Sequence, residues 1–214
     1  MRIDVFSDVV CPWCFIGKRR LERALAGRPD IAAEVHWRAF QLNPGLPPEG
    51  MDRRAYLEAK FGGAARARQV HATVIAVGAG EGIAFNFDAI RRTPSTVQAH
   101  RLIRLADRQN RQNEVVEALF RAYFLDGRDI GSNRELAEIA AEGGLDPALA
   151  ESFLAGTAET QDVLAEGAFA ARVGINGVPC FILNGRYALS GAQEPEALYP
   201  LFDLALQEAA AKSA

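Results

Sequence analysis

The chain has 214 residues, of which 49% are hydrophobic and 24% are charged, and its formal net charge is −3. This length can bury a substantial core in one large domain or two small ones, and the composition is that of an ordinary globular protein. The slightly acidic balance argues against a general nucleic-acid-binding protein, which needs a basic face to neutralise phosphates.

The first residues show no targeting or membrane segment. Asp4 and Asp8 interrupt the opening stretch, where a secretory signal has a long apolar core, and Cys11 follows almost at once. No run approaches the roughly 20 apolar residues that a membrane span needs. We therefore expect a protein of the cytoplasm, where thiols are mostly kept reduced, with no membrane partner.

The first forty residues predict a strand, a helix and a second strand. Apolar residues alternate over Arg2–Ser7, as in a short buried strand. A helix is expected to open at Cys11, because Pro12 suits a first helical turn, and to end at Gly27. The second strand is expected at residues 34–40, so this part of the chain is a βαβ unit.

Helices dominate the middle of the chain. A connector rich in proline and glycine is expected at residues 41–50, and strand signals then nearly vanish. Ser95, Ser132 and Asp146 are suitable N-caps for three of the helices that follow. The helices are predicted at residues 52–61, 64–77, 94–108, 113–124, 133–143, 147–156 and 158–173.

Strands return only near the end of the chain. Residues 179–183 are a short apolar run, and Asn184-Gly185 is a strong hairpin signal before a returning strand and a last helix. The order βαβ, helical block, ββα predicts an α/β fold with one sheet, interrupted by an inserted all-helical domain. We place the sheet domain at residues 1–49 and 173–214, and the inserted domain at residues 50–172.

Cys11 and Cys14 stand at the junction of the first strand and helix, separated by Pro12 and Trp13. A thiol at a helix N-terminus meets unpaired N–H groups and the helix dipole, which both favour its thiolate. We therefore expect Cys11 to be the exposed nucleophile that attacks a disulfide. Cys14, one turn further on, is expected to be the shielded thiol that resolves the mixed disulfide. Pro12 and Trp13, the two residues between the thiols, are expected to tune the redox properties of the pair, although they add no charge to it.

A second feature is the run from Gly177 to Pro179. A proline at the start of a strand, just after a glycine-rich stretch, is a typical place for a cis X–Pro bond in a tight turn. We expect the bond between Val178 and Pro179 to be cis. The backbone of Val178 would then be free to pair with an extended substrate beside the active thiol.

The run from Asp4 to Gly17 closely resembles the DsbA-like thioredoxin-fold family, in particular its FrnE-like branch, as do residues 99–102 and 174–179. The resemblance spans essentially the whole chain. It implies a thioredoxin fold with an inserted helical domain, and an enzyme that oxidises, reduces or isomerises disulfides. It also implies that Cys11 and Cys14 form the redox pair and that the cis turn faces them.

Two positions depart from the family pattern. Many thioredoxin-fold enzymes carry a proton-handling acid where this chain has Val5; we expect Asp4 to point to the other face and Asp8 to lie in a loop. Cys180, directly after Pro179, is either a small buried core residue or a third thiol beside the pair. We favour burial, because an exposed third thiol would compete for the mixed disulfide.

Several other interpretations are weighed against this one. Half of a zinc site is disfavoured, because zinc usually takes four ligands and no second cysteine pair of this spacing exists, so we expect no metal. For His36, His71 and His100 we favour packing over catalysis. A non-catalytic peptide-binding module is disfavoured by the intact pair of Cys11 and Cys14.

The main functional alternative is a glutathione-dependent enzyme. Kappa-class glutathione transferases and 2-hydroxychromene-2-carboxylate isomerases look similar in architecture, but they usually carry a serine where Cys11 stands. We expect no cofactor, with glutathione left open as a co-substrate. The expected partners are disulfide-containing proteins or small thiols, no nucleic acid is expected, and a homodimer is left open.

Overall fold

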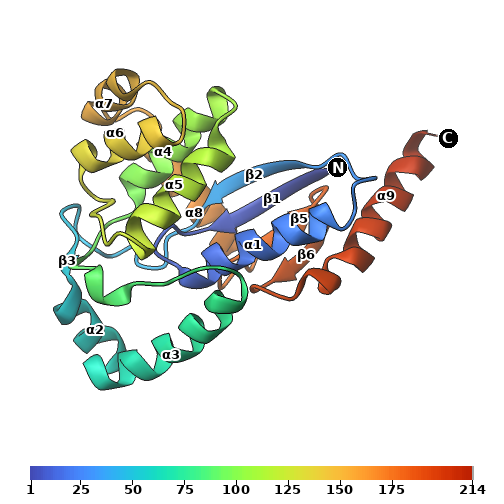
Figure 1. Cartoon of the computed structure of the whole chain (residues 1–214). Coiled ribbons are helices and arrows are strands. Elements are labelled where there is room, and N and C mark those ends of the chain that lie inside the picture. Colours follow the sequence, from blue (N-terminus) through green and yellow to red (C-terminus); the bar gives the residue numbers. More distant parts are fainter. Residues whose placement is uncertain (214) are drawn as a thin grey trace.

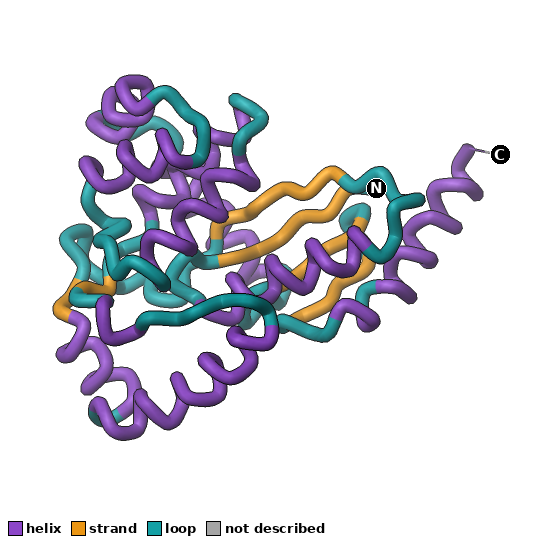
Figure 2. Tube along the Cα trace, in the orientation of Figure 1, coloured by secondary structure: helices purple, strands orange, loops and turns teal. Residues whose placement is uncertain are grey.

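The structure, a computed structural model, describes residues 1–213 and contains a four-stranded sheet with the order β2-β1-β5-β6. Strand β2 is parallel to β1, and β5 and β6 are antiparallel to their neighbours (Figures 1 and 2). The two ends of the chain thus share one sheet, which confirms the predicted α/β fold. The strands are β1 (Arg2–Ser7), β2 (Glu34–Ala39), β5 (Cys180–Leu183) and β6 (Tyr187–Ser190).

Helices cover both faces of this sheet. Helices α1 (Pro12–Ala26) and α9 (Tyr199–Ser213) lie on one face, and α8 (Thr160–Arg172) lies on the other (Figure 1). The side chains of β1 alternate between the two faces of the sheet. Ile3 and Val5 are fully buried in the core on the α1 side. Phe6 points the other way and stacks on Phe169 of α8, with 6.4 Å between the ring centroids.

Most of the chain between β2 and β5 is helical, as predicted. Figure 1 shows α4 to α7 gathered at the β2 side of the sheet, with α2 and α3 as a separate pair. Short 3₁₀ turns lie at Phe87–Ala89 and Pro195–Ala197. The helices are α2 (Arg53–Phe61), α3 (Ala64–Gly80), α4 (Val97–Arg108), α5 (Gln112–Phe124), α6 (Asn133–Glu142) and α7 (Pro147–Ala155).

Two expectations about this region were wrong. The insertion is not purely helical, because β3 (Met51–Asp52) pairs with β4 (Arg92–Thr93) in an antiparallel ladder. Gly50 permits this pairing: a Cβ there would lie 2.7 Å from the Thr93 carbonyl oxygen, so only glycine lets the backbones approach. Helix α4 begins later than expected and has Thr96, not Ser95, as its N-cap.

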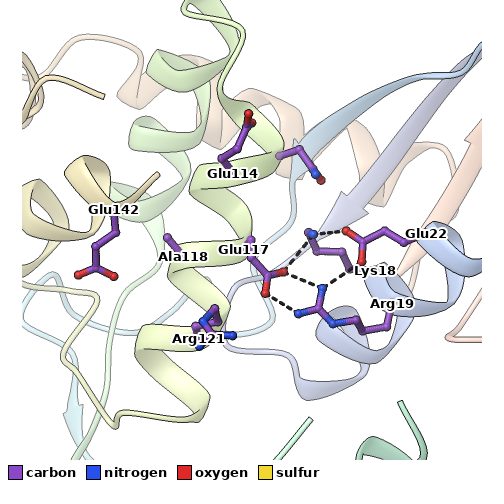
Figure 3. Close-up of a pocket in the computed structure, with 9 residues that line it drawn as sticks. Lys18, Arg19, Glu22, Glu114, Glu117, Ala118, Arg121 and Glu142 are labelled. Atoms are coloured by element: carbon purple, nitrogen blue, oxygen red, sulfur yellow. Dashed lines mark hydrogen bonds and ion pairs between the residues drawn. The ribbon is translucent and has the colours of Figure 1, made fainter. Parts of the chain in front are cut away.

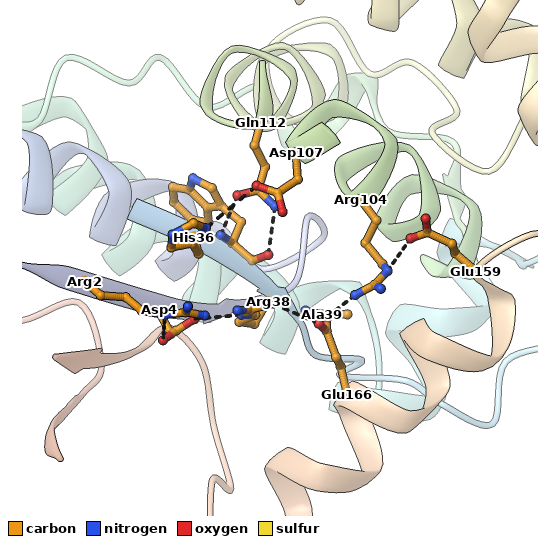
Figure 4. Close-up of polar contacts among 11 residues, drawn as sticks. Arg2, Asp4, His36, Arg38, Ala39, Arg104, Asp107, Gln112, Glu159 and Glu166 are labelled. Carbon is orange, nitrogen blue, oxygen red and sulfur yellow. Dashed lines mark hydrogen bonds and ion pairs between the residues drawn. The ribbon is translucent and has the colours of Figure 1, made fainter. Parts of the chain in front are cut away.

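The edge strand β2 is covered by the insertion. Gln112 of α5 is buried, accepts a hydrogen bond from the Trp37 N–H at 2.8 Å and donates one to the Trp37 carbonyl at 3.1 Å (Figure 4). Its amide thereby satisfies strand groups that a neighbouring strand would otherwise bind. Helix α8 packs on both α4 and β2, so the residue boundaries of the two domains stay predictions.

Charged side chains tie α8 and α4 to the outer face of the sheet. Arg38 of β2 donates to Asp4 of β1 at 2.7 Å and to Glu166 of α8 at 3.3 Å, and Arg104 of α4 donates to Glu166 at 2.8 Å (Figure 4). Burial raises the pKa of Asp4, but hydrogen bonds from Arg2 and Arg38 outweigh it and hold that pKa below its ordinary value. Asp4 therefore faces α8, as expected, and points away from the α1 side.

A second charged network joins α1 to α5. Lys18 of α1 has only 2% of its side chain exposed, and its ammonium pairs with Glu117 of α5 at 3.0 Å and with Glu22 (Figure 3). Arg19 also binds Glu117, and its guanidinium lies over the Phe15 ring. These ion pairs hold α1 against α5 of the insertion. No helix within residues 1–213 has both the length and the apolar character to cross a membrane.

Candidate active site

The junction between β1 and α1 carries the first of the predicted thiols. Cys11 is the N-cap residue of α1, with extended backbone angles of φ −95 and ψ 112, and Pro12 fills the first helical position as predicted. The Cys11 N–H donates to the Asp8 carbonyl at 2.9 Å, and the Cys14 N–H donates to the Cys11 carbonyl at 3.0 Å. Cys11 and Cys14 are free thiols, one helical turn apart.

The exposure of Cys11 differs from the expectation. Cys14 has no exposed surface, as predicted, but Cys11 retains only 4%, so the expectation of an exposed Cys11 was wrong. The cause lies in distant segments that close over the thiol. Its Sγ is 3.6 Å from the Val178 carbonyl oxygen, and the side chain forms part of the wall of a cavity of about 270 Å³. Cys11 thus faces this cavity, while Cys14 lies in the core behind it.

The environment of Cys14 favours its protonated form. Burial raises the pKa of Cys14 well above its ordinary value, and the neighbouring Cys11 thiol raises it further. The Ser7 side chain and the Asp8 backbone act in the opposite direction without cancelling the effect. Since the thiolate is the nucleophile in exchange, a protonated, buried Cys14 is a poor first attacker. Cys11, at the cavity wall, is the more accessible of the two thiols for an attack on a disulfide.

The predicted cis bond is present between Val178 and Pro179. Pro179 packs directly on α1 at Gly17, where an added Cβ would lie 2.7 Å from the Pro179 Cγ. The Val178 side of this turn lines the cavity together with Trp13. Because the Val178 carbonyl accepts the Cys11 thiol hydrogen, this acceptor is already engaged in the dithiol form.

Cys180 is buried on the opposite face of the sheet from the redox pair. It is 5% exposed and packs with Phe6, Ala170 and Ile175 under α8. The reason is strand alternation: Cys180 pairs with Phe6 in the β1–β5 register, so both side chains point toward α8. Burial also raises the pKa of Cys180 above its ordinary value. The expectation of a buried core thiol is confirmed.

Asp8 was expected only to lie in a loop, but the structure shows that its side chain is buried. Its side chain is 1% exposed, and its Oδ2 accepts the Leu42 N–H at 2.8 Å. Its Oδ1 has no hydrogen-bond partner within residues 1–213, and lies 3.6 Å from the His100 Nε2. His100 is also buried, and its Nε2 is 3.1 Å from the Phe40 carbonyl oxygen, so its predicted packing role is confirmed.

The signal for Asp8 in the sequence is faint. An acid three residues before Cys11 lies in a loop by every local criterion, and its partners are far away along the chain. The Asp8 backbone carbonyl accepts the Cys11 N–H, while its buried side chain lies against Leu42 and His100. The part of the chain that the structure describes holds no group of three or more His, Cys, Asp or Glu side chains placed to share a metal ion.

The chain matches a known protein family over most of its length. The family model of the DSBA-like thioredoxin domain matches residues 2–202. The chain therefore belongs to the DSBA-like thioredoxin domain family, a family of thiol oxidoreductases, and its fold is thioredoxin-like. The FrnE-like branch within this family stays a prediction.

Individual relatives cover nearly the whole chain. The uncharacterized protein YwbO of Bacillus subtilis is 30% identical over 190 residues, which are 86% of this chain and 87% of that protein. A probable DsbA oxidoreductase from Streptomyces coelicolor has a TM-score of 0.87 and 34% identity, and the match covers 97% of this chain and 91% of that one. A 2-hydroxychromene-2-carboxylate isomerase covers 100% of both chains with a TM-score of 0.72, but at 15% identity it shares the fold alone.

Proposed function

We propose that this protein is a thiol–disulfide oxidoreductase of the cytoplasm that uses Cys11 and Cys14 as its redox pair. The observation that carries the proposal is the placement of the two thiols at the start of α1. Cys11 faces a cavity, and Cys14 is fully buried one turn behind it. The substrates would be disulfides of proteins or of small thiols, and the two cysteines need no metal or bound cofactor for this chemistry.

The reductive direction of the proposed reaction has two steps. The Cys11 thiolate attacks one sulfur of the substrate, a mixed disulfide forms, and the first substrate thiol leaves as a thiolate that takes up a proton. Cys14 then loses its proton and attacks the Cys11 sulfur, so the second substrate thiol leaves. Two electrons pass from the enzyme dithiol to the substrate, and the reverse sequence oxidises a dithiol.

The start of α1 supports the first step. The N-cap position of Cys11 places it at the N-terminal end of α1, where the helix dipole is positive. Pro12 and Trp13 contribute no charge at this end of the helix. In the dithiol form the Cys11 thiol donates to the Val178 carbonyl at 3.6 Å, a hydrogen bond that is given up when the thiolate forms.

A glutathione-dependent transferase or isomerase is the alternative function. It is favoured only by the shared fold of the 2-hydroxychromene-2-carboxylate isomerase, whereas the cysteine pair favours exchange. The two differ in what they require of the second thiol. Isomerisation uses a single group at the position of Cys11, but exchange with release of product needs Cys14 as well.

A disulfide-reduction assay tests the proposal. The wild-type protein should reduce a disulfide substrate stoichiometrically, and Cys11→Ser should abolish the activity in a protein that still folds. Failure of the reduced wild-type protein to exchange with any disulfide would refute the proposal. A glutathione-dependent isomerisation that survives Cys14→Ser would favour the alternative instead.

A further inference from the structure

The cavity in front of Cys11 has a wall that the exchange chemistry itself does not use. Helix α2 contributes Arg53, Tyr56 and Lys60 to this wall, which we call the α2 wall. The cavity lining within residues 1–213 contains both of these cations and no acidic side chain. The positive charge of the α2 wall, next to Cys11, favours an anionic ligand in this cavity.

Arg53 forms no ion pair with any acidic residue in the described residues 1–213. Its Nη1 donates to the Thr93 hydroxyl at 3.2 Å, but its buried Nε has no hydrogen-bond partner and the guanidinium forms no ion pair in the described part of the chain. A buried N–H without an acceptor destabilises the folded protein, so such groups are often found at binding sites. The neighbouring Arg54 behaves differently, since its side chain is 85% exposed and pairs with Glu58 at 3.3 Å.

Lys60 is held against the same wall. Its ammonium donates to the Tyr56 hydroxyl at 2.6 Å, and that hydroxyl donates to the Asn43 Oδ1 at 3.1 Å. The Lys60 nitrogen also lies 5.2 Å from the centroid of the Tyr56 ring, while the Arg53 guanidinium carbon lies 5.6 Å from it. Tyr56 thus keeps both cations at the cavity, and Lys60, like Arg53, forms no ion pair within residues 1–213.

Burial and the positive charge of Arg53 in the α2 wall lower the pKa of the neighbouring His71. His71 of α3 lines the same cavity, and its pKa lies below the ordinary value because of burial and the positive charge of Arg53, with Asp88 opposing weakly. The imidazole is therefore neutral at pH 7 and adds no third charge. The apolar side of the cavity lining next to Cys11 includes Trp13 and Val178.

We propose that the α2 wall binds the carboxylate of a small acidic disulfide, so that low-molecular-weight disulfides bearing a carboxylate are preferred substrates of Cys11. This inference rests on the proposed function. The cavity of about 270 Å³ is slightly smaller than the roughly 300–1,000 Å³ of typical ligand pockets, which suits a small molecule. The guanidinium and ammonium would bind the carboxylate, and the apolar side would receive the methylene groups that link it to sulfur.

Binding of the carboxylate leaves the exchange reaction itself unchanged. Its atoms and electrons balance with the enzyme dithiol and the substrate disulfide alone. Reduced enzyme and one acidic disulfide give the Cys11–Cys14 disulfide and two acidic thiols, with two electrons passing to the substrate. A single turnover can therefore be measured with stoichiometric substrate. Trp13 lies between the two cysteines and provides a fluorescence signal for their oxidation.

The test compares three symmetric disulfides of similar size. These are 3,3′-dithiodipropionate with two carboxylates, bis(2-hydroxyethyl) disulfide with no charge, and cystamine with two ammonium groups. Each second-order rate constant is divided by that of the same disulfide with free dithiothreitol, which removes differences in intrinsic reactivity. The normalised constants should decrease in that order, with a ratio of at least about tenfold between the extremes at low salt.

Matched variants identify the residues responsible. Arg53→Gln should lower the constant for the acidic disulfide about tenfold and that for the neutral one less than about twofold, as the loss of one charge-assisted contact implies. Arg54→Gln removes the same charge from the same helix, but outside the cavity, and should change neither. Lys60→Gln alters an exposed side chain and provides a second variant should Arg53→Gln not fold.

The possible results distinguish failure of the proposed function from failure of the proposed carboxylate preference. If the neutral disulfide does not react with the wild-type protein, the proposed function itself fails. If it reacts but the normalised constants show no preference for the acidic disulfide, only the present inference is overturned. Equal losses in the Arg53→Gln and Arg54→Gln proteins would also overturn it, because net charge alone would then explain the preference.

Discussion

Gly17→Ala is a perturbation whose effect can be worked out from the contact between α1 and the cis turn. The new Cβ would lie 2.7 Å from the Pro179 Cγ, 3.3 Å from the Pro179 Cβ and 3.2 Å from the Phe181 Cζ. The Pro179 side chain is a ring closed on its own backbone, so it cannot rotate away from the added atom. Either α1 or the turn at Val178 must therefore move.

Two opposing effects determine how much Gly17→Ala changes the free energy of unfolding. Inserting a methyl group into a packed core costs about 1–3 kcal/mol, whereas alanine in a helix interior is about 1 kcal/mol more favourable than glycine. The net loss in the free energy of unfolding should thus be about 1 kcal/mol, with an upper limit near 2 kcal/mol. Because the turn carries the Val178 carbonyl that contacts Cys11, the exchange rate should also fall several-fold.

Gly167→Ala in α8 is the matched control. A Cβ there would meet only the Gln41 side-chain oxygen, at 4.0 Å, so the substitution should stabilise the protein by about 1 kcal/mol and leave exchange unchanged. Urea unfolding followed by tryptophan fluorescence measures the change in the free energy of unfolding for both variants. The reasoning is refuted if Gly17→Ala stabilises the protein as much as Gly167→Ala does and exchanges disulfides at the wild-type rate.

Two further predictions concern Cys180 and His71. Cys180→Ala should lower the free energy of unfolding by about 1 kcal/mol and leave disulfide exchange nearly unchanged; a folded variant that loses activity would contradict its core role. Because the folded-state pKa of His71 is depressed, its contribution to stability is present above about pH 6.5 and is lost as the pH falls through the folded value. His71→Phe should therefore reduce the fall in Tm between pH 7 and pH 5, and an unchanged fall would exclude His71 as its cause.

Local sequence signals were sufficient to predict most of the helices and strands and to locate the motif of Cys11 and Cys14. Pro12 at a helix start, Asn184-Gly185 in the hairpin and the glycine before Val178–Pro179 each act through their own backbone, so sequence patterns predict them. The β3–β4 ladder was missed because two residues are too few to show a period. Its pairing depends on Gly50, whose close approach to Thr93 appears only in three dimensions.

The features that were missed or left open at the site depend on distant contacts. Cys180 had two possible faces, and the choice follows from the helix α8 that covers Phe6, which no local pattern specifies. Cys11 is less exposed than expected because Val178 and the insertion close over it. The burial of Asp8 likewise requires Leu42 and His100, which lie on other elements.

The central claim is that Cys11 attacks the substrate and Cys14 resolves the mixed disulfide, and trapping the intermediate tests it most directly. Reduced Cys14→Ser protein is treated with bis(2-hydroxyethyl) disulfide, and the modified peptide is identified by mass spectrometry. The account predicts a stable adduct on Cys11, and in the wild-type protein a Cys11–Cys14 disulfide with no adduct. An adduct that forms on Cys14 in Cys11→Ser protein at a comparable rate, with none on Cys11 in the Cys14→Ser protein, would contradict it.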